Sequence, residues 1–251
     1  MKKVILISII IISKISASEL PKTGLDLLKK EPASLEYQIL GQEAQRVLGA
    51  SNNTMLPILK FGKFDSTKAF KLATTNSDAI VINEEEFDKM PYGAKRCTLM
   101  HESVHAKYND SKKMWGSALL GFVVGGVGSY HFLSKYKKLF FPKTSGFAIG
   151  FYAAYKSLVF YSRFMEQRAD REGHYASACS KCVHEAAQHC QKQTFDNAVK
   201  LYGEERLEEA LAVLEKNRQV SGYLSIKELS KIAKDLGDKV CDYHTREQGN
   251  R

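Results

Sequence analysis

The segment best suited to catalysis is His101-Glu102-Ser103-Val104-His105. Residues four positions apart share one face of an α-helix, so His101 and His105 can bind one metal ion. Glu102 then lies beside that metal, where it can take a proton from a water molecule. This is the HExxH pattern of zinc hydrolases. The alternative is a surface helix with unrelated histidines. The apolar residues around the motif instead predict a partly buried helix, in which two unpaired imidazoles would be costly.

A zinc site of this kind needs a third protein ligand and leaves its fourth position for water. Glu166 and Asp170 are spaced i and i+4 on a second predicted helix. One of these carboxylates can bind the metal while the other orients a ligand histidine. Glu172 and His174 are alternative third ligands, but neither has a paired carboxylate.

The two motifs together, HExxH and then Glu166-Gln167-Arg168-Ala169-Asp170, resemble the signature of a family of membrane zinc peptidases. That family includes the CAAX prenyl endopeptidase, the HtpX heat-shock protease and the mitochondrial Oma protease. The resemblance extends from about residue 78 to about residue 175. It implies one Zn²⁺ per chain and a polypeptide substrate.

The resemblance also implies a role for each site residue. His101, His105 and Glu166 would bind the zinc, with Glu102 as the general base and Asp170 as support for the site.

Two further features follow from the same resemblance. An edge strand near Ala79–Ile82 would hold the substrate backbone as an added strand. Family members often carry a His-Pro…Arg element near the end of the chain, and the nearest match here is His244-Thr245-Arg246. His244 is therefore a candidate for the active-site wall, although the proline is absent.

Four of the five cysteines lie late in the chain, at Cys179, Cys182, Cys190 and Cys241. In an exported protein they are expected to form two disulfides, with Cys97 buried and free. The competing hypothesis is a second zinc site built from Cys179 and Cys182 together with His184 or His189.

These residues must be positioned by the helices and strands around them. The sequence pattern predicts an α+β fold that is mainly α. We expect a zincin-like metallopeptidase domain with a small β-sheet, an inserted hydrophobic helical hairpin and a C-terminal helical region. Short strands are predicted at 55–59 and 79–82, and helices at 35–48, 91–108, 162–191, 194–216 and 225–236. The expected segments are a signal peptide at 1–17, the N-terminal part of the peptidase domain at 18–113, the hairpin at 114–164, the third-ligand helix at 165–192 and the C-terminal region at 193–251.

The chain begins with two lysines, a short apolar run and small residues, which is typical of a secretory signal peptide. Met114 to Leu133 carries no Lys, Arg, Asp or Glu and has the length of a membrane span. The lysine-rich loop at 134–143 is expected to stay cytoplasmic by the positive-inside rule, with the active site outside. A buried hairpin remains the alternative.

The formal charge of +9 does not require a nucleic-acid partner, because the lysines flank the signal and the hairpin rather than forming one basic stretch. The expected partners are therefore a polypeptide substrate and membrane lipid. The sequence predicts an exported, membrane-attached zinc metalloendopeptidase that acts on membrane or misfolded exported proteins. The alternative is a catalytically inactive relative that serves as a membrane-associated chaperone or adaptor.

Overall fold

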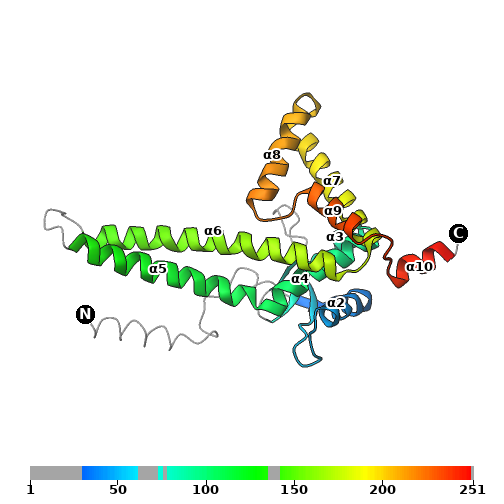
Figure 1. The fold of residues 1–251 in the computed structure, drawn as a ribbon, viewed down its shortest axis with the longest axis horizontal. Helices are drawn as coiled ribbons and strands as arrows, with labels where there is room; N and C mark the ends of the chain where they lie inside the picture. The colour runs from blue at the N-terminus through cyan, green and yellow to red at the C-terminus, as the bar shows by residue number, and fades with distance from the viewer. Residues whose placement is uncertain (1–29, 62–72, 76–77, 135–141, 250–251) are drawn as a thin grey trace.

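The computed structural model describes residues 30–61, 73–75, 78–134 and 142–249. The predicted signal peptide and most of the lysine-rich loop lie outside these residues. The fold is α+β and mostly helical (Figure 1). Its elements are β1 (Lys30–Pro32), α2 (Leu35–Val47), β2 (Ile58–Phe61), β3 (Ala73–Thr75), β4 (Ile80–Ile82), α3 (Glu84–Asp88), α4 (Tyr92–Tyr108), α5 (Asp110–Ser134), α6 (Pro142–Ala176), α7 (Ser180–Tyr202), η2 (Glu204–Arg206), α8 (Leu207–Val220), α9 (Ile226–Asp235) and α10 (Asp242–Gly249).

The four described strands form one small mixed sheet in the order β1-β2-β4-β3. β4 pairs in parallel with β2 and antiparallel with β3. All three residues of β4 are buried, as expected for an apolar strand with neighbours on both sides. The prediction of an edge strand near Ala79–Ile82 is therefore wrong. Among the described residues the strand at that edge is β3.

Helix α4, which carries the HExxH motif, is packed between the sheet and the other helices. It contacts α2, β3, α6 and α7. Pro91 caps its start, as the sequence predicts, and Asn109 ends it in the left-handed conformation with φ 53°. Leu99, Met100 and Val104 are almost fully buried. The motif helix thus belongs to the core and is not a surface helix.

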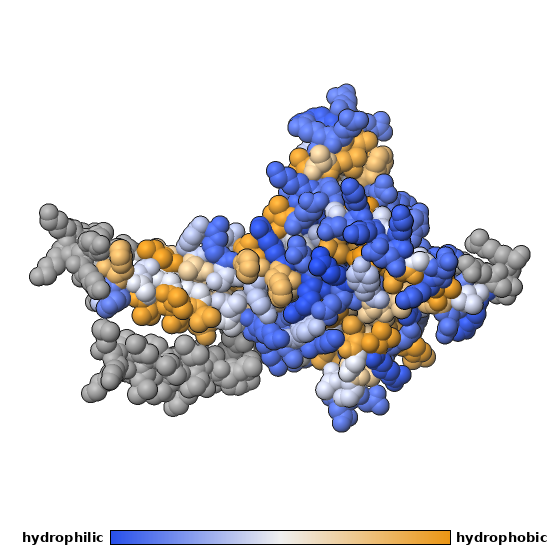
Figure 2. Space-filling view, in the orientation of Figure 1, coloured by the Kyte–Doolittle hydropathy of each residue, from blue (hydrophilic) through white to orange (hydrophobic). Residues whose placement is uncertain are grey.

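Helices α5 and α6 pack side by side and form an arm that projects from the body of the protein (Figure 1). The space-filling view shows apolar residues along this arm (Figure 2). Within the described part of the chain, no helix combines the length and the hydropathy that crossing a membrane requires.

Helix α6 continues without a break from the arm into the third-ligand segment. The expected boundary between residues 164 and 165 therefore lies inside one helix.

The single helix predicted for 162–191 is wrong, because the chain turns after Ala176 and restarts at Ser180. Ala178, with φ 47°, makes this turn. The helix predicted for 194–216 is likewise interrupted, at Gly203. By contrast, the capping box at the start of α9 is confirmed, with reciprocal bonds between Ser225 and Glu228.

Candidate metal centre

Three side chains from two helices bring their ligand atoms together. Nε2 of His101 and Nε2 of His105 lie 3.1 Å apart. Oε2 of Glu166, on α6, lies 3.2 Å from the first nitrogen and 3.6 Å from the second. A tetrahedral zinc ion with Zn–N distances of about 2.0–2.1 Å separates its ligand atoms by about 3.4 Å. The observed spacing fits such an ion.

The other nitrogen of each imidazole is held by a carboxylate. Nδ1 of His101 lies 2.7 Å from Asp170 and Nδ1 of His105 lies 2.8 Å from Asp110. Each Nδ1–H group therefore donates a hydrogen bond to a carboxylate, so that the Nε2 lone pairs face the centre. Oε2 of Glu166 is buried and makes no hydrogen bond. Three lone-pair donors facing one another in a buried site match the ligand set of a cation.

The electrostatics of the metal-free site agree with this arrangement. Burial disfavours charge on His101, but the hydrogen bond with Asp170 and the adjacent carboxylate of Glu166 raise its pKa well above the usual value. Burial likewise opposes ionisation of Glu166, yet the two histidines hold the pKa of this carboxyl far below its usual range. The carboxylates stabilise positive charge at this point, which a divalent cation would supply.

Asp110 belongs to the candidate site and was not predicted from the sequence. It is almost fully buried and is shared between His105 and the guanidinium of Arg168, which donates a hydrogen bond to it. Burial raises the pKa of Asp110, but the bonds from these two partners lower it overall. The left-handed Asn109 redirects the chain so that Asp110, the first residue of α5, points back at the motif.

Glu102 lies at the boundary between α4 and the sheet. The hydroxyl of Thr75, on β3, lies 2.7 Å from the carboxylate Oε2 of Glu102 and 2.9 Å from its backbone carbonyl. Thr75 therefore fixes the position of the expected base. It also places the edge of β3 next to the metal centre.

The C-terminal region reaches the centre through the segment before α9. The backbone N–H of Leu224 donates to Oδ2 of Asp170 at 2.8 Å, while Oδ1 of that carboxylate holds His101. The ring of Tyr223 stacks on His101 with centroids 5.9 Å apart. Gly222 adopts φ +98°, and a Cβ there would lie 2.6 Å from the backbone of Arg163. Only glycine fits this close approach.

A cavity of about 400 Å³ lies at this centre. This volume is within the usual range for ligand sites. Its lining includes the three residues of β3 and the side chains of His101, Glu102, His105, Glu166, Asp170 and Tyr223.

The structure also shows where the alternative third ligands, Glu172 and His174, and the candidate wall residue His244 lie. Glu172 accepts a hydrogen bond from Tyr108, and Nδ1 of His174 bonds the backbone carbonyl of Asp170. Neither belongs to the ligand group formed by His101, His105 and Glu166. His244 does not line the cavity, so its expected role in the active-site wall is wrong. Instead it is fully buried beside three cysteines.

All five cysteines are free thiols, so the expected pair of disulfides is not found. Cys179, Cys182 and Cys241 lie together, and Cys190 lies apart from them. The group of possible metal ligands contains Cys179 and Cys182, as the competing hypothesis expected, but its histidine is His244 and neither His184 nor His189. His184 is exposed and bonds Gln188.

Comparison with known proteins gives no relative: no protein-family model matches the chain, and neither a curated protein nor a solved structure matches it.

Proposed function

We propose that the chain is a zinc-dependent metalloendopeptidase. The observation that carries the proposal is the convergence of His101, His105 and Glu166 on one point, with Glu102 beside them in the same cavity. This is the ligand set and the base of the zinc peptidases that the sequence resembles. On this proposal the fold is a zincin-like domain into which the α5–α6 arm is inserted.

Zinc bound at this centre would supply a Lewis acid for the scissile carbonyl and would lower the pKa of water. Asp170 and Asp110 keep the two histidines in the tautomer that presents Nε2 to the metal. Glu102, held by Thr75, takes the proton from the attacking water and returns it to the leaving amine.

Tyr223 provides a hydrogen-bond donor at the same cavity. A phenol is protonated at neutral pH, and burial, followed by the nearby carboxylates, raises the pKa of Tyr223 further. Its ring is fixed by stacking on His101. We assign its hydroxyl to stabilise the negative charge that develops on the carbonyl oxygen.

The substrate backbone is assigned to the edge of β3. Ala73, Thr74 and Thr75 line the cavity, and no described strand pairs with the far edge of β3. A peptide added there would form main-chain hydrogen bonds that tolerate many side chains. This fits the cleavage of unfolded segments, as in misfolded exported or membrane proteins.

The arm formed by α5 and α6 is assigned to contact with lipid. Its exposed apolar side chains include Leu120 and Val124, which are 64% and 63% exposed. An apolar surface of this kind on a projecting element suits a membrane. Co-sedimentation of the full chain with phospholipid vesicles tests this assignment. Unchanged binding after Leu120→Glu with Val124→Glu would contradict it.

The deciding experiment compares the wild type with Glu102→Gln in zinc content and in casein cleavage. The variant should bind zinc as the wild type does, because all three ligands remain. Its proteolysis should fall by about 10²–10⁴-fold, because the base is lost. Cleavage at the wild-type rate would remove Glu102 from the mechanism. A wild type that binds zinc but cleaves no protein would favour the inactive chaperone or adaptor.

A further inference from the structure

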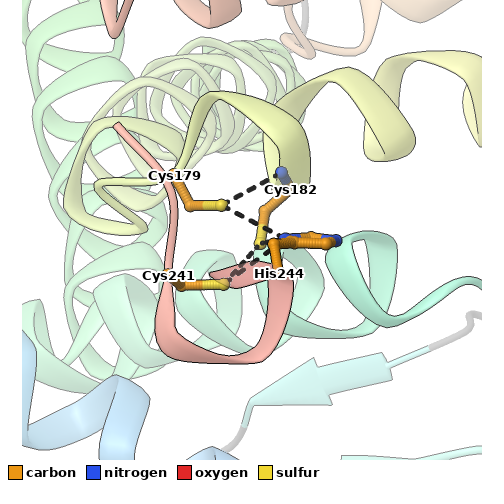
Figure 3. A group of neighbouring side chains, drawn as sticks. All are labelled: Cys179, Cys182, Cys241 and His244. Carbon is orange, nitrogen blue, oxygen red and sulfur yellow. Dashed lines mark hydrogen bonds between the residues drawn. The ribbon is translucent and has the colours of Figure 1, made fainter. Parts of the chain in front are cut away.

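Figure 3 shows a second group of four potential metal ligands. None of the four lines the cavity of the first centre. Cys179 and Cys182 come from the start of α7, and Cys241 and His244 come from the last segment of the chain. The four ligand atoms lie within 4.8 Å of one another. About sixty residues of sequence separate the two pairs, so only the tertiary fold unites them.

The distances match a tetrahedral site. Nδ1 of His244 lies 3.4 Å from Sγ of Cys179, 3.6 Å from Sγ of Cys182 and 3.4 Å from Sγ of Cys241. The sulfurs of Cys182 and Cys241 are 3.6 Å apart. A zinc ion with Zn–S of about 2.3 Å and Zn–N of about 2.0–2.1 Å places its ligands about 3.4–3.8 Å apart. A disulfide requires about 2.05 Å between sulfurs.

The surroundings of the ligands are those of a metal site. Nε2 of His244 lies 2.8 Å from Oε1 of Glu185, which accepts the hydrogen bond of the Nε2–H group, so that the Nδ1 lone pair faces the sulfurs. The backbone N–H of Cys182 donates to Sγ of Cys179 at 3.4 Å, a contact that favours a thiolate. Cys179, Cys182 and His244 are fully buried.

We propose that Cys179, Cys182, Cys241 and His244 bind a second, structural Zn²⁺. The four protein ligands fill the tetrahedron, so no position is left for water or substrate. On binding, the three thiol protons pass to solvent and the sulfurs become thiolate ligands. This proposal does not depend on proteolytic activity.

The site connects the C-terminal segment to α4, the helix that carries the HExxH motif. Glu185 uses one carboxylate oxygen for His244 and the other to accept the backbone N–H of Gly93, in the first turn of α4, at 2.8 Å. A Cβ at Gly93 would lie 2.5 Å from Cα of Cys182, so glycine permits this approach. The ring of Tyr243 also stacks on Tyr92. The zinc thus joins α7, the C-terminal segment and the start of α4.

The test uses the full chain purified under reducing conditions, in the Glu166→Ala background, so that the catalytic centre does not contribute metal. The chain should hold about one zinc ion, and Cys182→Ser or Cys241→Ser should lose it. Cys190→Ser is the matched control, because Cys190 lies on α7 with Cys182 but outside the ligand group. This variant should keep the zinc ion.

Cobalt substitution identifies the ligands even where a serine variant fails to fold. Co²⁺ in the Glu166→Ala chain should show thiolate-to-metal charge-transfer absorption, which a site of two histidines and a carboxylate does not give. Absence of that band would overturn the proposal. Retention of the zinc by Cys182→Ser, or a disulfide between Cys182 and Cys241 in the purified chain, would overturn it as well. If Glu102→Gln failed to abolish proteolysis, the proposed peptidase mechanism would be wrong, but the proposal of a structural zinc site would still stand.

Discussion

Nδ1 of His105 lies 2.8 Å from a carboxylate oxygen of Asp110, only five residues further along the chain. In a continuous helix these side chains would point in different directions, about 140° apart. The left-handed Asn109 between α4 and α5 ends one helix and re-aims the next, so the carboxylate turns back onto the motif. His101 obtains the equivalent support from Asp170, on a different helix.

Replacing Asp110 with Asn should weaken zinc binding by about 10–100-fold, because the amide cannot hold His105 as strongly. Competition with a chelator of known zinc affinity measures the loss. Asp238→Asn removes an exposed carboxylate and should have wild-type affinity. Equal affinities for both variants would show that Asp110 does not orient the ligand.

Glu166→Ala and Asp170→Asn should differ in zinc content after dialysis against a mild chelator. The first variant leaves two imidazoles, a set too poor to keep the metal at the catalytic centre. The second keeps all three ligands but loosens His101, so the centre should retain part of its zinc. Glu172→Ala is the control, because Glu172 bonds Tyr108 away from the centre. Full occupancy of the catalytic centre in Glu166→Ala would place the third ligand elsewhere.

Tyr223→Phe should bind zinc normally and lower kcat by about 10²–10³-fold, because one donor to the developing oxyanion is removed while the ring remains. Steady-state kinetics with a fluorogenic peptide separate kcat from KM. Tyr243→Phe makes the same change in a tyrosine that stacks on Tyr92, away from the cavity, and should leave kcat unchanged. A rise in KM alone for Tyr223→Phe would assign the hydroxyl to substrate binding.

Ser225→Ala should lower the free energy of unfolding by about 1 kcal/mol at neutral pH, because the cap of α9 is lost. Urea denaturation measures this change. Ser225 lowers the pKa of Glu228 through hydrogen bonds, so the stabilisation from Glu228 is present above its unfolded pKa and is lost as the pH falls through the folded value. The difference between variant and wild type should therefore shrink below about pH 4.

The control for the cap is Ser230→Ala. Ser230 lies inside α9 and bonds the carbonyl of Ile226, so its removal should cost little. A loss as large as that of Ser225→Ala would mean that the cap is not the source of the effect.

Local periodicity explains what the sequence could predict. The i, i+4 spacing predicts that His101 and His105 share one face of α4 and that Glu166 and Asp170 share one face of α6, since each motif lies on a single helix. The choice of Glu166 as the ligand came from the family resemblance. The capping box of α9 is equally local.

What the sequence could not predict depends on contacts between distant segments or on one unusual backbone conformation. Asp110 requires the left-handed Asn109, and Leu224 meets Asp170 only after α8 turns back. The histidine of the cysteine cluster is His244 because α10 returns to α7, which no spacing rule reveals. The edge strand was misassigned because strand order is not encoded in the apolar pattern of β4.

The uninterrupted course of α6 connects the arm directly to the candidate metal centre. Its 35 residues span about 52 Å as a helix, with the arm at one end and Glu166 near the other. On the other side of the arm, α5 begins at Asp110, the residue that holds His105. Both helices of the arm therefore run directly into residues of the candidate metal centre. We expect a displacement of the arm to move the side chains of that centre.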